Sequence, residues 1–297
     1  MAGEMVMSAY VGCGAGNISR TQVHNRRESG PDLEALHQLP MEPLDTEPAG
    51  LFVHKDFISK EHEETILQIL CDQLDWPDRK GRRSLHYGYT FSYKTFAIDT
   101  DVPHAPFPDW LLPLLPADEG RPPDQVCVQH YPPGTGIPPH ADTHSAFDQL
   151  YSLSLGSPVL MQFCRPGGVG GGGGGGGDGS AARGEAIKVD VDLAPRSMMR
   201  MSGDARLHWT HGIRARKTDT LVEEAFDDDG EEQKKTSAVV VRPRRDRWSI
   251  TYRWLREGGV CECGDERLCD TAQRRMGVER EYRWKAAEGK SSPEDTG

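Results

Sequence analysis

Residues 138–147 read PPHADTHSAF, and this stretch places two metal-ligand side chains, His140 and Asp142, two residues apart. The two prolines before His140 disfavour a helix and indicate the mouth of a strand. Because side chains alternate along a strand, His140 and Asp142 point to the same side and can bind one metal ion together. The pattern predicts a metal site on a β-strand, although a His-x-Asp tripeptide alone is more often a hydrogen-bonded structural histidine.

Partners elsewhere in the chain strengthen this interpretation. His211, in the segment WTHGI (209–213), can complete a facial triad with open positions, the geometry used for iron(II) oxygen chemistry. Arg247 and Arg253 lie six residues apart on a β-like run, so both face one side of a strand. Two arginines beside a metal suit a dicarboxylate cosubstrate, because planar guanidinium forks match carboxylates. Tyr131 can add a hydroxyl donor; an exposed strand face is the alternative.

The wider sequence predicts a mainly β fold with flanking helices. A first strand is expected at Leu51–Val53, followed by a helix that Ser59 caps and that ends at Trp76-Pro77. Its core face would carry Ile66, Ile69, Leu70 and Leu74. Short β-like runs bounded by Pro and Gly then suggest a sandwich or barrel. These runs are Tyr87–Tyr93, Val126–Tyr131, Tyr151–Leu155, Val159–Phe163, Ala186–Val191, Ser197–Ser202 and Trp248–Trp254.

Composition sets the domain limits. We expect a mostly disordered tail at residues 1–48, one domain at 49–276 and a polar tail at 277–297. The Gly-rich tract (167–184) lacks the lysine and spacing of a phosphate loop and is expected to be a flexible hairpin loop. The acidic run (219–236) is expected to be a surface loop. The chain has no apolar run of membrane-spanning length and no recognisable signal peptide.

Charge and cysteine content bear on partners and compartment. The net charge is -11, but most of the excess lies in residues 1–50 and 219–232. Two basic clusters remain, and they are either nucleic-acid contacts or solvated charge. The first contains Lys80, Arg82 and Arg83; the second contains Arg242, Arg244, Arg245 and Arg247. Seven cysteines, an odd number, favour a reducing compartment. We expect the cytoplasm, with the nucleus as a second location.

The order His140-x-Asp142, His211, Arg247-x5-Arg253 resembles the AlkB family of iron(II)- and 2-oxoglutarate-dependent oxygenases, over roughly residues 50–275. The resemblance implies a double-stranded β-helix (jelly-roll) core. It also implies that His140, Asp142 and His211 bind Fe(II), and that Arg247 and Arg253 bind the carboxylates of 2-oxoglutarate with help from Tyr131. The family often has Asn two residues before this tyrosine, where this chain has Gln129. With O2 as second cosubstrate, the reaction would yield succinate, carbon dioxide and an oxidised substrate.

Three segments resemble one branch more specifically, the eighth animal AlkB homologue, which hydroxylates wobble uridines in tRNA. They are HADTHSAF with SLSLGS (140–157), WTHGI (209–213) and the tail pattern Cys-x-Cys-x5-Cys. In that branch the three thiolates bind a structural zinc with the histidine two residues after the metal-binding aspartate. The resemblance therefore implies a zinc site made by His144, Cys261, Cys263 and Cys269. Three thiolates and one imidazole form an ordinary closed zinc set; free thiols in a tail are the alternative.

The branch implies a tRNA substrate, 5-methoxycarbonylmethyluridine in the anticodon loop, reached as an unstacked base. Arg82, Arg83, Tyr87 and Tyr89 are candidate substrate contacts, although alternating aromatics are more often core residues. The animal proteins also carry an RNA-recognition domain and a methyltransferase. We therefore expect a monomer that docks tRNA through its own basic clusters or through a separate partner. Two other functions stay open: an oxidative demethylase of alkylated DNA or RNA, and a non-enzymatic zinc-stapled RNA-binding module.

Overall fold

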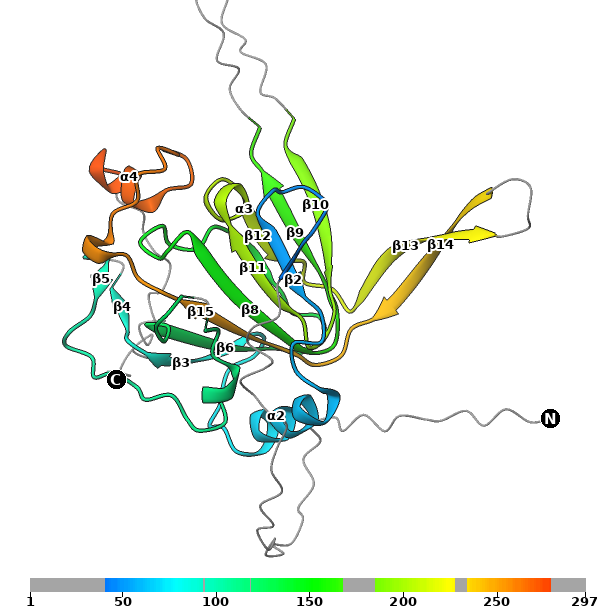
Figure 1. Ribbon diagram of the computed structural model, residues 1–297, viewed down its shortest axis with the longest axis horizontal. Coiled ribbons are helices and arrows are strands. Elements are labelled where there is room, and N and C mark those ends of the chain that lie inside the picture. The colour runs from blue at the N-terminus through cyan, green and yellow to red at the C-terminus, as the bar shows by residue number, and fades with distance from the viewer. Residues whose placement is uncertain (1–40, 93, 118, 168–184, 228–233, 279–297) are drawn as a thin grey trace, which may run out of the picture.

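A computed structural model describes residues 41–92, 94–117, 119–167, 185–227 and 234–278. Two antiparallel sheets form its centre (Figure 1). The seven-stranded sheet contains, in spatial order, β1 (Glu42–Pro43), β2 (Leu51–His54), β11 (Met198–Ser202), β8 (Gln149–Gly156), β15 (Arg247–Arg253), β6 (Gln125–Tyr131) and β3 (Arg83–Gly88). The four-stranded sheet contains β10 (Ile187–Leu193), β9 (Val159–Arg165), β12 (Thr210–Ile213) and β7 (Ile137–His140). The remaining elements are α2 (Lys60–Asp72), α3 (Gly203–Leu207), α4 (Asp270–Arg275), β4 (Phe91–Ser92), β5 (Ala97–Ile98), β13 (Thr218–Asp227), β14 (Lys234–Pro243) and the 3-10 turns Leu112–Leu114 and Glu257–Gly259.

The chain crosses repeatedly between the two sheets. β6, β8, β11 and β15 belong to the larger sheet, whereas β7, β9, β10 and β12, which lie between them in sequence, belong to the smaller one. This alternation is the jelly-roll, or double-stranded β-helix, arrangement. The predicted fold class is therefore confirmed.

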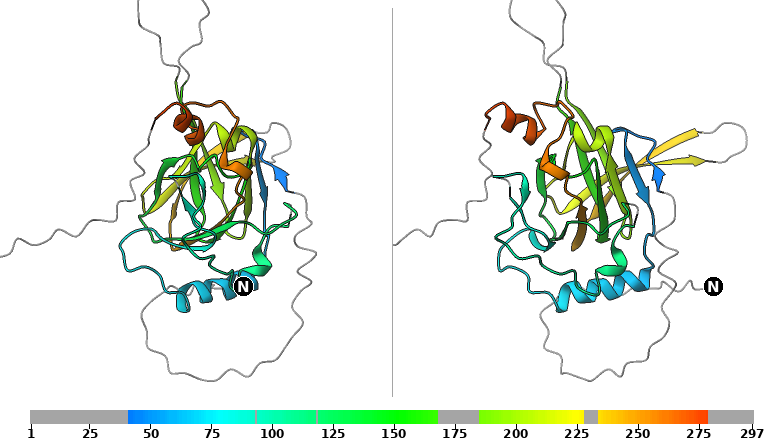
Figure 2. Two further views of the ribbon diagram at one scale, coloured as in Figure 1. Left: turned by 90° about the vertical axis from the view of Figure 1, so that its left-hand side faces the viewer. Right: turned by 60° about the vertical axis from the view of Figure 1, so that its left-hand side comes forward.

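Alternation along the strands of the larger sheet separates two cores. In β15, Trp248 and Ile250 face a core that also contains Ile66 and Leu70 of α2. The opposite faces of the strands enclose a second core between the sheets, which includes Met199 of β11. α2 runs along the outside of the sheets (Figure 2). The residues at even spacing from Arg247 therefore face the space between the sheets.

The helix α2 begins as expected but ends earlier. The Ser59 side chain accepts a hydrogen bond from the His62 amide at its N-terminus. The helix ends at Asp72 rather than at Trp76, because Trp76 folds back and its indole Nε1 donates to the Leu70 carbonyl at 2.7 Å. Glu63, for which no role was expected, is buried and accepts from the Gly156 amide at 2.9 Å.

Two predicted boundaries are wrong within the described chain. Residues 41–48 are not tail, because β1 pairs with β2 and the Leu44 amide donates to the Leu51 carbonyl at 2.9 Å. The expected strand 87–93 instead divides at Gly88, whose φ of 85° suits glycine and ends β3. Residues 1–40, 168–184 and 279–297, which carry most of the predicted tails and Gly-rich loop, lie outside the described residues.

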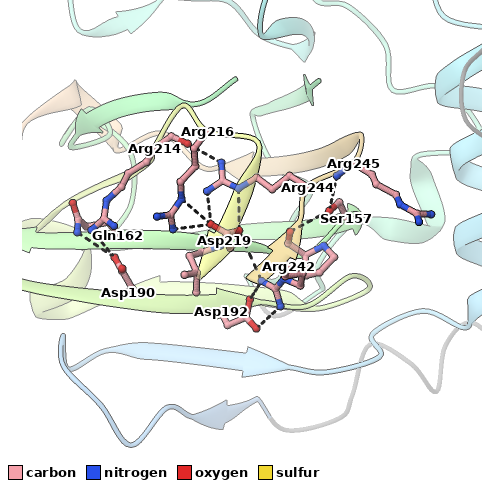
Figure 3. A network of polar contacts seen from close by, with 12 residues as sticks. Ser157, Gln162, Asp190, Asp192, Arg214, Arg216, Asp219, Arg242, Arg244 and Arg245 are labelled. Carbon is pink, nitrogen blue, oxygen red and sulfur yellow. Dashed lines mark hydrogen bonds and ion pairs between the residues drawn. The ribbon is translucent and has the colours of Figure 1, made fainter. Parts of the chain in front are cut away.

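The predicted acidic loop at 219–236 is also wrong. Residues Thr218–Asp227 and Lys234–Pro243 pair over their whole length as β13 and β14, a two-stranded ribbon that projects from the sheets (Figures 1 and 2). At its base, the fully buried Asp219 carboxylate accepts hydrogen bonds from Arg244 and Arg216 (Figure 3). The acidic composition suggested solvent exposure, but Asp219 is buried against Arg216, three residues away, and Arg244, twenty-five residues away, and composition does not reveal this pairing.

No helix in the described parts of the chain is both long and apolar enough to cross a bilayer.

Candidate functional site

The predicted triad comes together between the two sheets. His140 at the end of β7 is the cross-strand partner of His211 in β12, and their ring centroids lie 4.5 Å apart. Asp142 follows two residues after β7, and its Oδ2 lies 3.4 Å from Nε2 of His211. One ligand atom from each of the three residues lies within 4.8 Å of the others. Two imidazoles and a carboxylate at this spacing fit a facial three-ligand site for iron(II).

The protonation states also suit a metal. The His140 Nδ1 lies 2.9 Å from the Pro138 carbonyl, so this nitrogen donates and leaves Nε2 as the ligand nitrogen. Burial lowers the pKa of His211 to about 3, so its imidazole is neutral at physiological pH. Burial by itself would raise the pKa of Asp142, but Arg253 and the two imidazoles hold it well below its usual range. The ligand set therefore contains the neutral His211 imidazole, the Asp142 carboxylate and the Nε2 atom of His140.

Arg253 contacts the carboxylate ligand directly. Its Nε and Nη2 donate to Asp142 Oδ1 at 3.0 and 2.5 Å. This contact orients the carboxylate, because a side chain that hydrogen-bonds to a metal ligand fixes the direction in which the ligand points. The sequence predicted that Arg253 contacts the cosubstrate, and the structure shows that it also contacts Asp142. Arg253 also lines the pocket beside the triad, so both roles are compatible with its position.

Arg247 lies deeper in the same pocket. The side chain is 3% exposed, and Nη2 donates to Ser154 Oγ at 3.0 Å. Its Nε and Nη1 are buried without a hydrogen-bond partner among the described residues. Burial lowers the pKa of Arg247 to about 10, which still leaves it protonated at neutral pH. A buried cation with two unused donors is costly unless an anion pairs with it, so the pocket fits a carboxylate.

Tyr131 and Gln129 lie beside this guanidinium. Arg247 is the cross-strand partner of Tyr131, and its Cζ lies 5.2 Å from the centroid of the tyrosine ring. The Tyr131 hydroxyl donates to Gln129 Oε1 at 2.5 Å. Both residues line the pocket with the iron-type triad. The cosubstrate residues predicted from the sequence are therefore gathered in one place.

Sequence reasoning missed all eight of the other residues that line this pocket. Six of these residues alternate on β8, β11 and β15, and the other two come from β7 and β9 of the smaller sheet, so period-two alternation could have identified them once the facing side of each strand was known. They are Ile137, Leu150, Ser152, Met161, Met199, Met201, Ser249 and Thr251.

A second cluster contains the four predicted zinc ligands. One ligand atom each from His144, Cys261, Cys263 and Cys269 lies within 4.8 Å of the others, and Nδ1 of His144 is 3.4 Å from Cys263 Sγ. The Cys269 sulfur accepts from the Ala272 amide at the start of α4. Amide donors of this kind stabilise thiolates.

The electrostatics of the second cluster favour a metal. Burial lowers the pKa of His144 to about 4, which keeps the imidazole neutral. Burial raises the pKa of Cys263 to about 12, so metal binding must displace its proton. Three sulfur donors and one imidazole, of which only Cys263 is partly exposed, fit a closed four-ligand zinc site rather than a catalytic one. The two clusters share one loop, because Asp142 and His144 are two residues apart.

Two of the four predicted substrate contacts, Arg83 and Tyr87, lie in β3, and Arg82 and Tyr89 flank it. Arg83 donates to His130 Nδ1 at 2.7 Å, and Tyr87 packs edge-on against Trp110; His130 and Trp110 both lie on the α2 side of the sheet, away from the triad. Arg82 lies over the Tyr131 ring, 5.9 Å from its centroid, and therefore near the pocket. Tyr89 is 39% exposed, with its ring 4.6 Å from that of His104. Tyr89 is therefore exposed, and Arg82 is half-buried beside the Tyr131 ring.

Comparison with known proteins agrees with this geometry. The family model described as the 2OG-Fe(II) oxygenase superfamily matches residues 42–253. A Xenopus tropicalis protein named tRNA (carboxymethyluridine(34)-5-O)-methyltransferase alkbh8 is 35% identical over 240 residues, which are 76% of this chain and 35% of that protein. The Arabidopsis thaliana Alkylated DNA repair protein ALKBH8 homolog is 33% identical over 248 residues, 79% of this chain and 67% of that protein.

A solved structure titled "The structure of OsALKBH1" superposes with a TM-score of 0.42 at 15% identity and covers 72% of this chain and 100% of that chain. The present chain spans about a third of the length of its animal relatives. From the family match and the shared sequence, the chain belongs to the 2OG-Fe(II) oxygenase superfamily, as an AlkB-type enzyme related to the ALKBH8 proteins.

Proposed function

We propose that this enzyme hydroxylates a modified wobble uridine, 5-methoxycarbonylmethyluridine, in the anticodon loop of tRNA. The observation that carries the proposal is the loop from Asp142 to His144, which serves at once an iron-type triad and a cluster of one histidine and three cysteines. This combination is the one that the resemblance to the wobble-uridine branch implies. The name of the Xenopus relative, which refers to carboxymethyluridine at position 34 of tRNA, supports the same substrate class.

In this proposal His140, Asp142 and His211 hold Fe(II), and Arg247 holds one carboxylate of 2-oxoglutarate by its unused Nε and Nη1 donors. Arg253 keeps Asp142 oriented and offers charge to the other end of the cosubstrate. Bound iron supplies the redox chemistry by which O2 converts 2-oxoglutarate to succinate and carbon dioxide and oxidises a substrate C–H bond.

The residues around the pocket have separable tasks. The Tyr131–Gln129 hydrogen bond fixes the wall beside Arg247. The methionines of β11 and β9 make the space between the sheets apolar, which excludes water and strengthens the charge pairing of Arg247 with a carboxylate. With only three protein ligands, a bound iron would have room for the cosubstrate and O2.

Docking of the RNA would use basic and aromatic side chains that keep some exposure to solvent. In the second basic cluster, Arg242 pairs with Asp192 and Arg244 pairs with Asp219, so these two charges serve the fold (Figure 3). Arg82 and Tyr89 keep their place as candidate contacts for phosphate and base. A separate RNA-binding protein or methyltransferase would supply the remaining affinity, and the enzyme would act in the cytoplasm.

The test is direct. Purified enzyme with Fe(II), ascorbate and 2-oxoglutarate should add one oxygen atom to 5-methoxycarbonylmethyluridine in an anticodon stem-loop, as measured by mass spectrometry of the digested nucleosides. An unmodified stem-loop of the same sequence is the matched control. Turnover of 2-oxoglutarate without oxygen transfer to the modified nucleoside would overturn the proposed substrate.

A second function has its own support. The Arabidopsis relative is named as an alkylated DNA repair protein, and a zebrafish relative 31% identical over 127 residues is named as a probable RNA/DNA demethylase. The same triad could oxidise an N-methyl group, which would then leave as formaldehyde. Formaldehyde release from oligonucleotides with methylated adenine or cytosine, without oxidation of the wobble uridine, would favour this demethylase. The non-enzymatic alternative is excluded by the family assignment.

A further inference from the structure

Arg206 is a buried cation that neither metal cluster includes. It belongs to α3, the short helix that leads toward His211, and its residue is only 2% exposed. Burial of a guanidinium costs several kcal/mol of effective penalty unless polar partners compensate it. The buried Arg206 guanidinium must therefore have polar partners that compensate this penalty.

The contacts of Arg206 fall on the loop that the two clusters share. Nη1 donates to the Asp142 carbonyl at 3.3 Å, and Nη2 donates to the Thr143 carbonyl at 2.6 Å. The next backbone group, the His144 amide, donates to Asp270 Oδ1 at 2.9 Å. Side chains from α3 and α4 thus bind three backbone groups between Asp142 and His144: the Asp142 carbonyl, the Thr143 carbonyl and the His144 amide. The Arg206 guanidinium therefore binds the backbone that connects Asp142, in the iron-type triad, to His144, in the second cluster.

The charge of Arg206 faces both clusters. Burial lowers the pKa of Arg206, while the carboxylates of Asp142 and Asp270 favour its charged form. In turn, after burial itself, Arg206 is the largest influence that lowers the pKa of His144, and it also lowers that of His211. A zinc ion with three thiolates and a neutral imidazole carries a net negative charge, so metal loading would compensate the buried guanidinium further.

We infer that Arg206 is a positioning residue that couples the two metal sites, by holding the backbone of Asp142 in register with that of His144. The inference rests on the proposed iron and zinc sites, not on the identity of the RNA substrate. An arginine is needed because its planar fork reaches two carbonyl groups at once, whereas a lysine ammonium is a single point donor. Zinc binding at His144 then stabilises the conformation of Asp142 that binds iron.

Arg256 offers a matched control. Its Nε donates to the His144 carbonyl at 3.0 Å, and its Nη2 also pairs with Asp148. It therefore holds the zinc side of the same loop, but none of its described hydrogen bonds reaches Asp142. Arg256→Met should leave the affinity of the iron site within about twofold of the wild-type value.

The experiment measures metal affinity rather than activity. Zinc-loaded protein is titrated anaerobically with Co(II), and binding at the triad is followed by its visible absorption, with bound zinc measured in parallel. Arg206→Met should raise the Co(II) dissociation constant about tenfold or more, the range that loss of such an outer contact produces, while zinc content stays at the wild-type level. The Co(II) dissociation constant of Arg206→Lys should lie between those of the wild-type chain and Arg206→Met. Because it keeps the charge, this variant also serves as the test if Arg206→Met does not fold.

Coupling is tested by a double-mutant cycle with Cys263→Ser, which removes a zinc ligand. If Arg206 transmits the effect, Cys263→Ser should weaken Co(II) binding in the wild-type chain but add little in the Arg206 variant. Additive effects, or an unchanged dissociation constant in Arg206→Lys and Arg206→Met, would overturn the inference. So would a wild-type chain that binds no zinc. Failure to oxidise the wobble uridine would contradict the proposed function but not this inference, because the titrations measure metal binding and not activity on RNA.

Discussion

Replacement of Arg247 by lysine is the change that most sharply probes the cosubstrate pocket. The side chain is buried, and its Nε and Nη1 have no hydrogen-bond partner in the described part of the chain, whereas Nη2 is bound to Ser154. Arg247→Lys keeps the positive charge but loses the fork that can donate twice to one carboxylate. The expected effect is therefore weaker binding of 2-oxoglutarate with the metal site unchanged.

The magnitude follows from the number of hydrogen bonds lost. A hydrogen bond to a charged group contributes about 1.5–3 kcal/mol. Loss of one of the two donors from Arg247 to a carboxylate should therefore raise the dissociation constant of 2-oxoglutarate by about 10- to 150-fold, at roughly 1.4 kcal/mol for each factor of ten. Arg247→Met loses both donors and the charge, so its effect should be at least as large.

The assay is calorimetric titration of 2-oxoglutarate into protein loaded with a redox-inert divalent metal at the triad. Arg242→Lys is the control, because Arg242 pairs with Asp192 outside the pocket. That variant should bind the cosubstrate as the wild-type chain does. If Arg247→Lys bound 2-oxoglutarate within twofold of the wild-type affinity, with the thermal stability unchanged, the role given to the unused donors would be refuted.

Three other changes have separate readouts. Asp142→Ala should abolish succinate formation without a large loss of thermal stability; wild-type turnover would contradict the iron assignment. Cys263→Ser should reduce bound zinc from about one per chain to near none and lower the melting temperature, and added iron should not restore activity; retained zinc would disprove the ligand set. Asp219→Asn should destabilise the fold by about 3 kcal/mol, because Arg244 stays buried without its carboxylate. Burial would raise the pKa of Asp219, but Arg244 holds it below the usual value, so this stability is complete above about pH 4 and decreases as the pH falls through the folded pKa. Urea denaturation at pH 7 and pH 3 should show a larger difference in the wild-type chain than in Asp219→Asn, and equal differences would refute the pairing.

The spacing of the motifs predicted the centre of the site, because residues that bind one metal or one cosubstrate must lie close together. The expected strand face holds for His140, but β7 ends there and Asp142 reaches the site from the loop that follows. The same argument placed Arg247 and Arg253 on one side of β15, where both line the pocket. The prediction for the two arginines needs only the period of a strand. The pocket-facing side of each neighbouring strand depends on register, which the period does not provide.

That dependence explains the errors on β3. Arg83 and Tyr87 have the right chemistry for a nucleic-acid contact, but their register opposite His130 and Val126 turns them toward the α2 side. Ser84, opposite Gln129, faces the pocket side instead. The choice between these two sets follows from cross-strand pairing that no local pattern encodes.

Long-range charge pairing explains the other omissions. Asp219 lies in an acidic run and Arg206 in a short polar helix, so composition favours solvent exposure for both. Their burial depends on partners distant in sequence, such as Arg244 for Asp219 and the Thr143 carbonyl for Arg206. Such residues are found only once the tertiary contacts are known.

Mass spectrometry of wobble nucleosides in tRNA from cells with and without the gene tests the proposed function most directly. Loss of the gene should remove the hydroxylated form of 5-methoxycarbonylmethyluridine and leave its unhydroxylated precursor, and the wild-type chain, but not Asp142→Ala, should restore it. An unchanged set of wobble nucleosides in the deletion, or full restoration by Asp142→Ala, would contradict the account.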